Sequence, residues 1–105
     1  MTQKSRREML EDMLVADPKD TFLRYALAME LAREGKTTEA VASLHNLIAD
    51  QPHYVPAYFQ AAQILVREGE TEPAAELLRQ GISVARERSD LHAAEEMAGL
   101  LVQID

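Results

Sequence analysis

The sequence contains no cysteine and no tryptophan, and aromatic residues make up only 5% of it. Without cysteine the chain has no disulfide, no thiolate nucleophile and no cysteine-based zinc site. A chain without thiols suits a reducing compartment, so we expect a cytoplasmic protein. Alanine, leucine and glutamate are abundant instead, and these residues favour helices, whereas the scarce aromatics favour strands. The composition therefore predicts an all-α protein.

Basic residues are outnumbered as well, because 11 Lys and Arg face 18 Asp and Glu and give a formal net charge of −7. A chain with a negative long-range field repels phosphate backbones, so we expect no nucleic-acid partner. No run of about 18 apolar residues occurs, and charged residues follow the basic start where a signal peptide would need an apolar stretch. We therefore expect no membrane partner, and one domain over residues 1–105.

An internal repeat organises the middle of the chain. The tripeptide Arg33-Glu34-Gly35 returns as Arg67-Glu68-Gly69. Further identical pairs at the same spacing within these two units are Ala28 and Ala62, Leu31 and Leu65, Thr37 and Thr71, Ala40 and Ala74, Leu44 and Leu78, and Ile48 and Ile82. Apolar residues recur every three or four positions on both sides of each glycine, which predicts two helices per unit. A catalytic motif would not repeat together with the spacing of its scaffold's core.

Gly35 and Gly69 lie where the first helix of each unit is predicted to end. Glycine adopts the left-handed conformation of such a turn without strain. We expect Thr37 and Thr71 to cap the next helix with their hydroxyls, and Pro73 to lie in its first turn. The repeated Arg-Glu-Gly is thus interpreted as a helix end and not as a reactive motif.

A helix–turn–helix unit of this length, about 34 residues, resembles the tetratricopeptide repeat. The matching positions are Leu27, Ala28, Leu31, Ala40, Leu44 and Pro52 in the first unit, and Tyr58, Ala61, Ala62, Leu65, Ala74 and Leu78 in the second. The sequence departs from the family pattern at Arg24, in place of an aromatic residue, and at Arg86, in place of proline. The resemblance implies a short right-handed α-solenoid of about six antiparallel helices.

Two full repeats are predicted at residues 20–52 and 54–86, flanked by a half-repeat helix at 4–16 and a capping helix at 90–103. Leu10, Met13 and Leu14 lie one repeat length before Leu44, Leu47 and Ile48. At the other end a step that is longer by two positions places Ala94 on Tyr58, Met97 on Ala61, Ala98 on Ala62 and Leu101 on Leu65. We attribute the extra length to a longer turn at 86–90, and we expect Met9, Met13 and Met97 to pack in the core.

No group of residues predicts catalysis, and we expect no cofactor and no metal. A metal site needs two or more converging ligands, and no two of the three histidines, His45, His53 and His92, are one helical turn apart. His92 and Glu96 share a helical face, where an exposed ion pair is favoured over a metal site completed from elsewhere. The serines have no glycine-rich elbow, and adjacent carboxylates diverge on a helix. We expect a protein that is not an enzyme, and a small metal-dependent enzyme is the least favoured alternative.

The resemblance implies a concave groove lined by the free face of the first helix in each unit. The candidate partner-binding residues are Phe22, Tyr25, Met29, Arg33, Phe59, Gln63, Val66 and Arg67. The three aromatic residues either contact a partner or pack against neighbouring helices. The two arginines either orient an acidic or C-terminal peptide, or cap the carbonyl ends of their own helices.

These residues predict a protein-interaction adaptor that holds a peptide or a partner segment in the groove. Some members of the family bind a terminal carboxylate with Lys and Asn side chains at these positions. This sequence has Tyr25, Met29, Phe59 and Gln63 there instead, so we do not expect a carboxylate site of that kind. The alternative is a self-associating structural module, in which a homodimer covers the same apolar surface.

Overall fold

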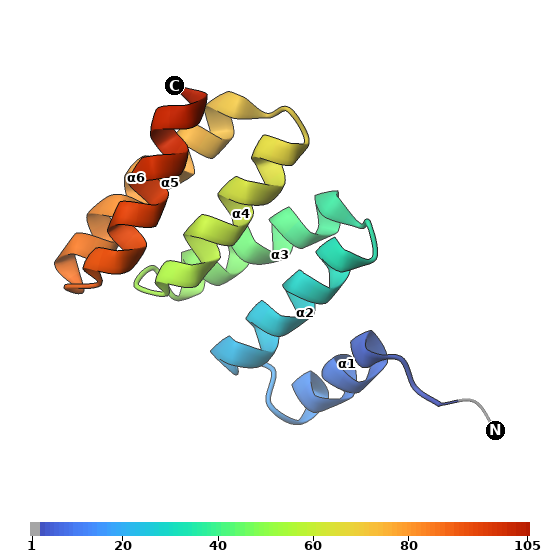
Figure 1. The fold of residues 1–105 in the computed structure, drawn as a ribbon. Coiled ribbons are helices and arrows are strands. Elements are labelled where there is room, and N and C mark those ends of the chain that lie inside the picture. Colours follow the sequence, from blue (N-terminus) through green and yellow to red (C-terminus); the bar gives the residue numbers. More distant parts are fainter. Residues whose placement is uncertain (1–2) are drawn as a thin grey trace.

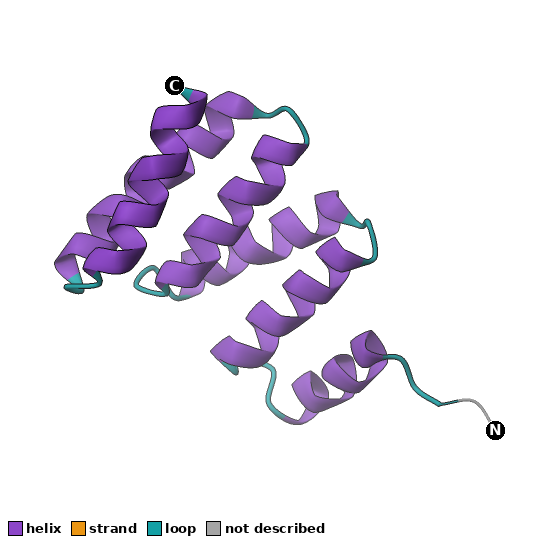
Figure 2. Ribbon diagram, in the orientation of Figure 1, coloured by secondary structure: helices purple, strands orange, loops and turns teal. Residues whose placement is uncertain are grey.

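The computed structural model describes residues 3–105, which form six helices and no strand. The helices are α1 (Arg6–Ala16), α2 (Thr21–Arg33), α3 (Thr37–Asp50), α4 (Val55–Arg67), α5 (Thr71–Glu87) and α6 (Leu91–Ile104). Figure 2 shows that short loops join them. The predicted all-α fold is therefore confirmed, although the first helix begins at Arg6 and not at residue 4.

The helices stack side by side into an elongated array of 49 × 28 × 20 Å, with α1 and α6 at its two ends (Figure 1). Each helix packs against the next one in the chain, and α4 also contacts α2 and α6. Thus α2, α4 and α6 are the first helices of successive repeats, and α1, α3 and α5 are second helices. No helix within residues 3–105 is both long enough and apolar enough to cross a membrane.

Three helices begin with a side-chain cap. Ser5 and Glu8 form a capping box, in which each side chain accepts a hydrogen bond from the other residue's backbone N–H. Asp20 accepts from the N–H of Leu23 at 2.8 Å, and Asp90 accepts from that of Ala93 at 3.2 Å. These caps fix where α1, α2 and α6 start.

The predicted left-handed turns are confirmed, with φ of +84° at Gly35 and +79° at Gly69. The N–H groups of Gly35 and Lys36 donate to the carbonyls of Ala32 and Leu31, so the turn itself pairs the last carbonyls of α2. The predicted threonine caps are wrong. Lys36 and Glu70 hold the cap positions, and Thr37 and Thr71 are already the first helical residues without a capping bond.

The extra length near residues 86–90 lies in a helix and not in a longer turn. Pro52 follows the end of α3, and Arg86 occupies the equivalent position in the next repeat. Because arginine does not break a helix as proline does, α5 continues to Glu87 and is 17 residues long. The helix then ends in a turn with Ser89 at φ +59°. Ser89 donates to Arg86 and Asp90 donates to Ala85, as at the two glycine turns. A serine therefore occupies a conformation that usually selects glycine.

The core runs along the array between the helices, and its largest fully buried side chains are Leu44, Leu47, Ile64, Leu78 and Met97. The prediction for Met97 is thus confirmed. The prediction for the other two methionines is wrong, because Met9 is 46% exposed and Met13 is 53% exposed. Both lie on the terminal helix α1, which contacts only α2 among the described helices.

Gly81 lies on α5 in close contact with both neighbouring helices, α4 and α6. A Cβ atom at this position would lie 2.7 Å from the Cβ of Tyr58 on α4 and 2.6 Å from the Sδ of Met97 on α6. Met97 has rotamers that relieve the second clash, but the Cβ of Tyr58 is fixed to its backbone. The absence of a side chain at Gly81 therefore sets the spacing of α4, α5 and α6.

We expect Gly81→Ala to lower the free energy of unfolding by about 1–2 kcal/mol. Overpacking costs about 1–3 kcal/mol, and the higher helix propensity of alanine offsets up to about 1 kcal/mol. Gly99→Ala is the matched control, because Gly99 is also inside a helix but a Cβ there meets nothing within 4 Å. That control should gain about 0.5–1 kcal/mol. Urea unfolding of both variants measures the difference, and equal shifts would contradict the close approach at Gly81.

Candidate partner-binding groove

An open groove of about 730 Å³ lies on the face of the array formed mainly by α2. It is bounded by the start of α1, by the beginning of α3 and by the end of α4. Its lining residues are Arg6, Phe22, Tyr25, Ala26, Met29, Glu30, Ala32, Arg33, Thr37, Arg67 and Glu68. The structure thus brings five of the eight predicted residues together, namely Phe22, Tyr25, Met29, Arg33 and Arg67.

Apolar side chains form a stripe along the groove face of α2. Phe22, Ala26 and Met29 recur at four- and three-residue steps, so they share one side of the helix. Phe22 is 65% exposed, which makes it one of the large apolar residues that no neighbouring helix covers. Of the two interpretations offered for this aromatic ring, the geometry therefore favours the one in which it faces outward.

Tyr25 forms a more rigid part of the same wall. Its ring packs edge-on against Tyr54, which immediately precedes α4, with 5.5 Å between the ring centroids and 71° between the planes. Partial burial, followed by the nearby Tyr54, raises the pKa of Tyr25 above its ordinary value, so the phenol stays neutral at physiological pH. This aromatic pair ties the groove face of α2 to the start of the second repeat.

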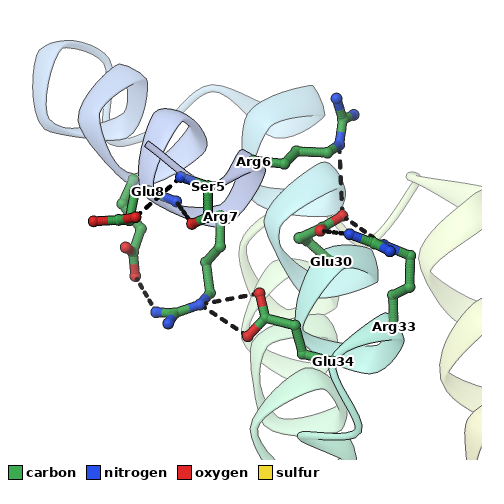
Figure 3. A network of polar contacts seen from close by, with 8 residues as sticks. Ser5, Arg6, Arg7, Glu8, Glu30, Arg33 and Glu34 are labelled. Carbon is green, nitrogen blue, oxygen red and sulfur yellow. Dashed lines mark hydrogen bonds and ion pairs between the residues drawn. The ribbon is translucent and has the colours of Figure 1, made fainter. Parts of the chain in front are cut away.

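A buried carboxylate lies at the arginine-rich end of the groove, and Figure 3 shows the charges around it. The side chain of Glu30 is only 7% exposed and pairs with Arg33 one turn away, whose Nε donates to Oε2 at 3.2 Å. Arg6 approaches the same oxygen from α1 at 3.5 Å. The hydrogen bond from Arg33 is the main reason why the pKa of Glu30 is lowered, whereas its burial acts in the opposite direction.

A second cluster holds α1 against the end of α2. The Nε of Arg7 donates to both carboxylate oxygens of Glu34, at 3.0 and 3.2 Å, and its Nη1 donates to Glu11 at 3.3 Å. These contacts fix the helix that carries Arg6 beside the groove (Figure 3). The position of Arg6 therefore depends on an ion pair between helices, and not only on its own helix.

The two predicted arginines differ in their surroundings. Arg33 is paired with Glu30, whereas no residue in the described range 3–105 forms an ion pair with Arg67. Both arginines lie in the last turn of their helices, but no hydrogen bond of either side chain to a helix carbonyl occurs in that range. Three arginines and two glutamates line the groove, so its lining carries one net positive charge on a chain of −7.

The other three predicted residues, Phe59, Gln63 and Val66, do not line this groove. All three are half-buried on α4, and Phe59 and Val66 pack against the main core. The helix α4 has α2 on one side and α6 on the other. Within residues 3–105, α2 has only α4 as a neighbour among these three helices, so its other side is not covered by a helix of this kind. Packing against neighbouring helices, the second interpretation of the aromatic residues, therefore describes Phe59.

Sequence reasoning missed Arg6, Glu30 and Glu68 as lining residues. The spacing of Glu30 and Arg33 could have indicated an ion pair, because residues three apart are neighbours on a helix. Arg6 could not have been found this way, since its place depends on how α1 packs on α2.

No cluster of three or more metal-ligating side chains occurs among the residues that the structure describes. His92 and Glu96 lie on one face of α6, with 3.3 Å between Nε2 and Oε1. The histidine side chain is 85% exposed, so the two side chains form a contact at the surface, on the helical face where the spacing placed them.

Comparison with protein families identifies a match to the model described as "Tetratricopeptide repeat" over residues 31–98. A search of curated proteins finds no match. Among solved structures, a tetratricopeptide repeat domain protein from Salinibacter ruber is 31% identical, with a TM-score of 0.80. The match covers 84% of this chain and 89% of that one.

Two more distant structures share the fold. The TPR2B domain of yeast Sti1, solved as a complex with pHsp70, is 23% identical with a TM-score of 0.85, over 93% of this chain and 78% of that one. The translocator chaperone SycD of the Yersinia enterocolitica type III secretion system is 17% identical with a TM-score of 0.83. Here the coverage is 93% of this chain and 68% of that one. At these identities the likeness extends to the fold alone.

The ion pairs of Glu30 predict a pH-dependent contribution to stability. Because its folded-state pKa is lowered, the contribution is present above the ordinary Glu pKa of about 4.3 and is lost as the pH falls through the folded value. We expect Glu30→Gln to melt below the wild type at pH 7, and the gap to close towards pH 3.

Thermal melts of both proteins across this range measure the gap. The control is Glu95→Gln, because Glu95 is exposed and forms no ion pair within residues 3–105, so its substitution should leave the melting temperature nearly unchanged at every pH. A gap for Glu30→Gln that stays constant with pH would show that Glu30 is not stabilised as a carboxylate.

Proposed function

Because the chain belongs to the tetratricopeptide repeat family, we propose that it is a protein-interaction module that holds a segment of a partner protein in the groove on α2. The role is binding and not catalysis. The lining of the groove consists of apolar side chains and charged groups, which suits recognition of an extended or helical segment.

One observation carries the proposal, which is the exposure of Phe22 in the groove that Met29 also lines. An aromatic ring with 65% of its surface in water contributes little to folding, but it can contribute strongly to binding once a partner covers it. Its neighbours in the groove add apolar area on the same face. We therefore infer that the partner places an apolar side chain against Phe22 and Met29.

The charges of the lining suggest what accompanies that apolar side chain. Arg67 lies at the groove's edge without an ion-pair partner among residues 3–105, whereas Arg33 is already paired with Glu30. A carboxylate of the partner would therefore be directed to Arg67 first. The Sti1 domain in complex with pHsp70 and the secretion chaperone SycD are examples of this fold in proteins that engage other proteins.

Selection from a random peptide library on the wild-type protein tests this function and needs no assumption about the partner's sequence. Peptides that bind the groove should lose about tenfold or more in affinity for Phe22→Ala, because truncating a central hot-spot residue costs about 2 kcal/mol or more. Fluorescence anisotropy with the selected peptides measures the affinities. The melting temperature of Phe22→Ala should stay near that of the wild type, since the ring is exposed.

Val15→Ala is the control, because Val15 is 83% exposed but does not line the groove. Its affinity for the selected peptides should equal that of the wild type. If the peptides bind Phe22→Ala and Val15→Ala equally well, the groove is not the binding site and the proposal is wrong.

A further inference from the structure

The two ends of the array expose positions that are buried inside it. Met13 on α1 is equivalent to Leu47 on α3, which lies one repeat length later. Leu47 is fully buried, whereas Met13 is 53% exposed. The difference arises because α3 contacts both α2 and α4, whereas α1 contacts only α2 among the described helices. Within residues 3–105, Met13 therefore has no first helix of its own repeat beside it.

At the other end of the array, α6 exposes a position that is buried on α4. Leu91 on α6 is equivalent to Val55 on α4, in the same register that pairs Ala94 with Tyr58. Val55 is 7% exposed and Leu91 is 63% exposed. The helix α4 packs between α3 and α5, whereas α6 packs against α5 and α4 only. Thus α6 is a first helix without the second helix of its repeat within residues 3–105.

Among residues 3–105, the two end helices correspond to the two halves of one repeat, since α1 has no first helix beside it and α6 has no second helix. They lie at opposite ends of the array, so they cannot meet within one chain (Figure 1). In the interior, α4 and α5 show how the two halves pack when both are present. This internal contact therefore indicates which kind of helix fits each exposed end.

Side-chain sizes at the equivalent positions are also complementary. Between α4 and α5 the bulky Tyr58 faces Gly81, which has no side chain. The equivalent of Gly81 on α1 is Met13, two repeat lengths earlier, and the equivalent of Tyr58 on α6 is Ala94. Large and small residues are therefore exchanged, so a methionine from α1 would fill the space that alanine leaves on α6.

A surface cavity of about 240 Å³ is present at this place on α6. Its lining residues are Arg86, Leu91, Ala94, Glu95 and Ala98. The cavity thus contains both Leu91, the exposed equivalent of a buried position, and Ala94, the small equivalent of Tyr58. Its apolar floor is open to solvent in the single chain.

From these observations we propose that copies of this chain associate head to tail, with α1 of one copy packed on the exposed face of α6 of another. Met13 of the first copy enters the cavity between Leu91 and Ala94 of the second. The contact reproduces the pairing of α4 with α5 and completes the interrupted repeat. It goes beyond peptide binding in the groove and does not depend on it.

This association differs from a symmetric homodimer. A head-to-tail contact uses two different surfaces, so each added copy leaves one of each free and growth does not stop at two. Two residues of α1 depart from the interior pattern, because Arg6 occupies the position of the buried Ala40 and Ala74, and Arg7 occupies that of the buried Ala75. The Nε of Arg6 lies 3.5 Å from Oε2 of Glu30 in its own chain (Figure 3).

Sedimentation of the 105-residue protein tests the proposal over about 10 μM to about 1 mM, a range suited to a small interface. The weight-average mass of the wild type should rise with concentration beyond twice the chain mass of 11.8 kDa. Met13→Glu and Leu91→Glu should each remain monomeric, because each places a charge in one of the two surfaces. Both side chains are exposed, so circular dichroism should show unchanged melting.

An equimolar mixture of the two variants separates this contact from the alternatives. Met13→Glu retains the α6 surface and Leu91→Glu retains the α1 surface, so together they should form a heterodimer that grows no further. The control Val15→Glu adds the same charge on another side of α1 and should associate like the wild type, because the equivalent Ala49 is exposed.

Four results would overturn the proposal: a wild type that stays monomeric throughout, a single-surface variant that still dimerises, a mixture that remains monomeric, or a Val15→Glu protein that loses association. A dimer of Met13→Glu alone would indicate a symmetric contact through α6. None of these results bears on peptide capture through Phe22, so the two proposals fail independently.

Discussion

Burial of each helix against its neighbours is the constraint on which this structure depends. The helices are 11 to 17 residues long, and isolated helices of this length are marginal in water. The repeat meets the constraint by placing apolar residues at the same positions of successive units, so that every interior helix is covered on two sides. At the ends the same positions are covered on one side only, and Met13 and Leu91 are exposed as a consequence.

The attachment of α1 links this constraint to the groove. Leu10 is the one buried residue that the described part of α1 contributes, and ion pairs from Arg6 and Arg7 to α2 complete the contact. Glu30 is shared between Arg6 and Arg33. A partner carboxylate that recruits Arg33 must therefore compete with a buried carboxylate that also helps to hold α1. The charge offered by the groove and the position of its α1 wall are thus coupled.

The sequence was sufficient to predict the six helices and the left-handed turns at Gly35 and Gly69, because periodicity and turn chemistry are local. It was not sufficient to predict exposure, which depends on what lies beside a helix. Tyr25 and Phe59 are equivalent in the repeat, yet only Tyr25 lines the groove. Thr37 does not cap α3 because Lys36 holds the cap position and Thr37 is already the first helical residue. The extension of α5 follows from the absence of proline at Arg86, but the conformation of Ser89 has no signal in the sequence.

Groove and ends use different positions of the repeat, and this separates the two proposed roles. The equivalents of Phe22 and Arg33 in the next repeat are Pro56 and Arg67, and both are exposed. Such positions carry no packing requirement, so substitutions there can change partner preference without disturbing the stack. The equivalents of Met13 and Leu91 include the buried core residues Leu47 and Val55, although Thr21, a second equivalent of Leu91, is polar and half-buried. An exposed apolar residue at such a position is free to pack against a further helix, and the proposed head-to-tail contact rests on this freedom and not on the groove.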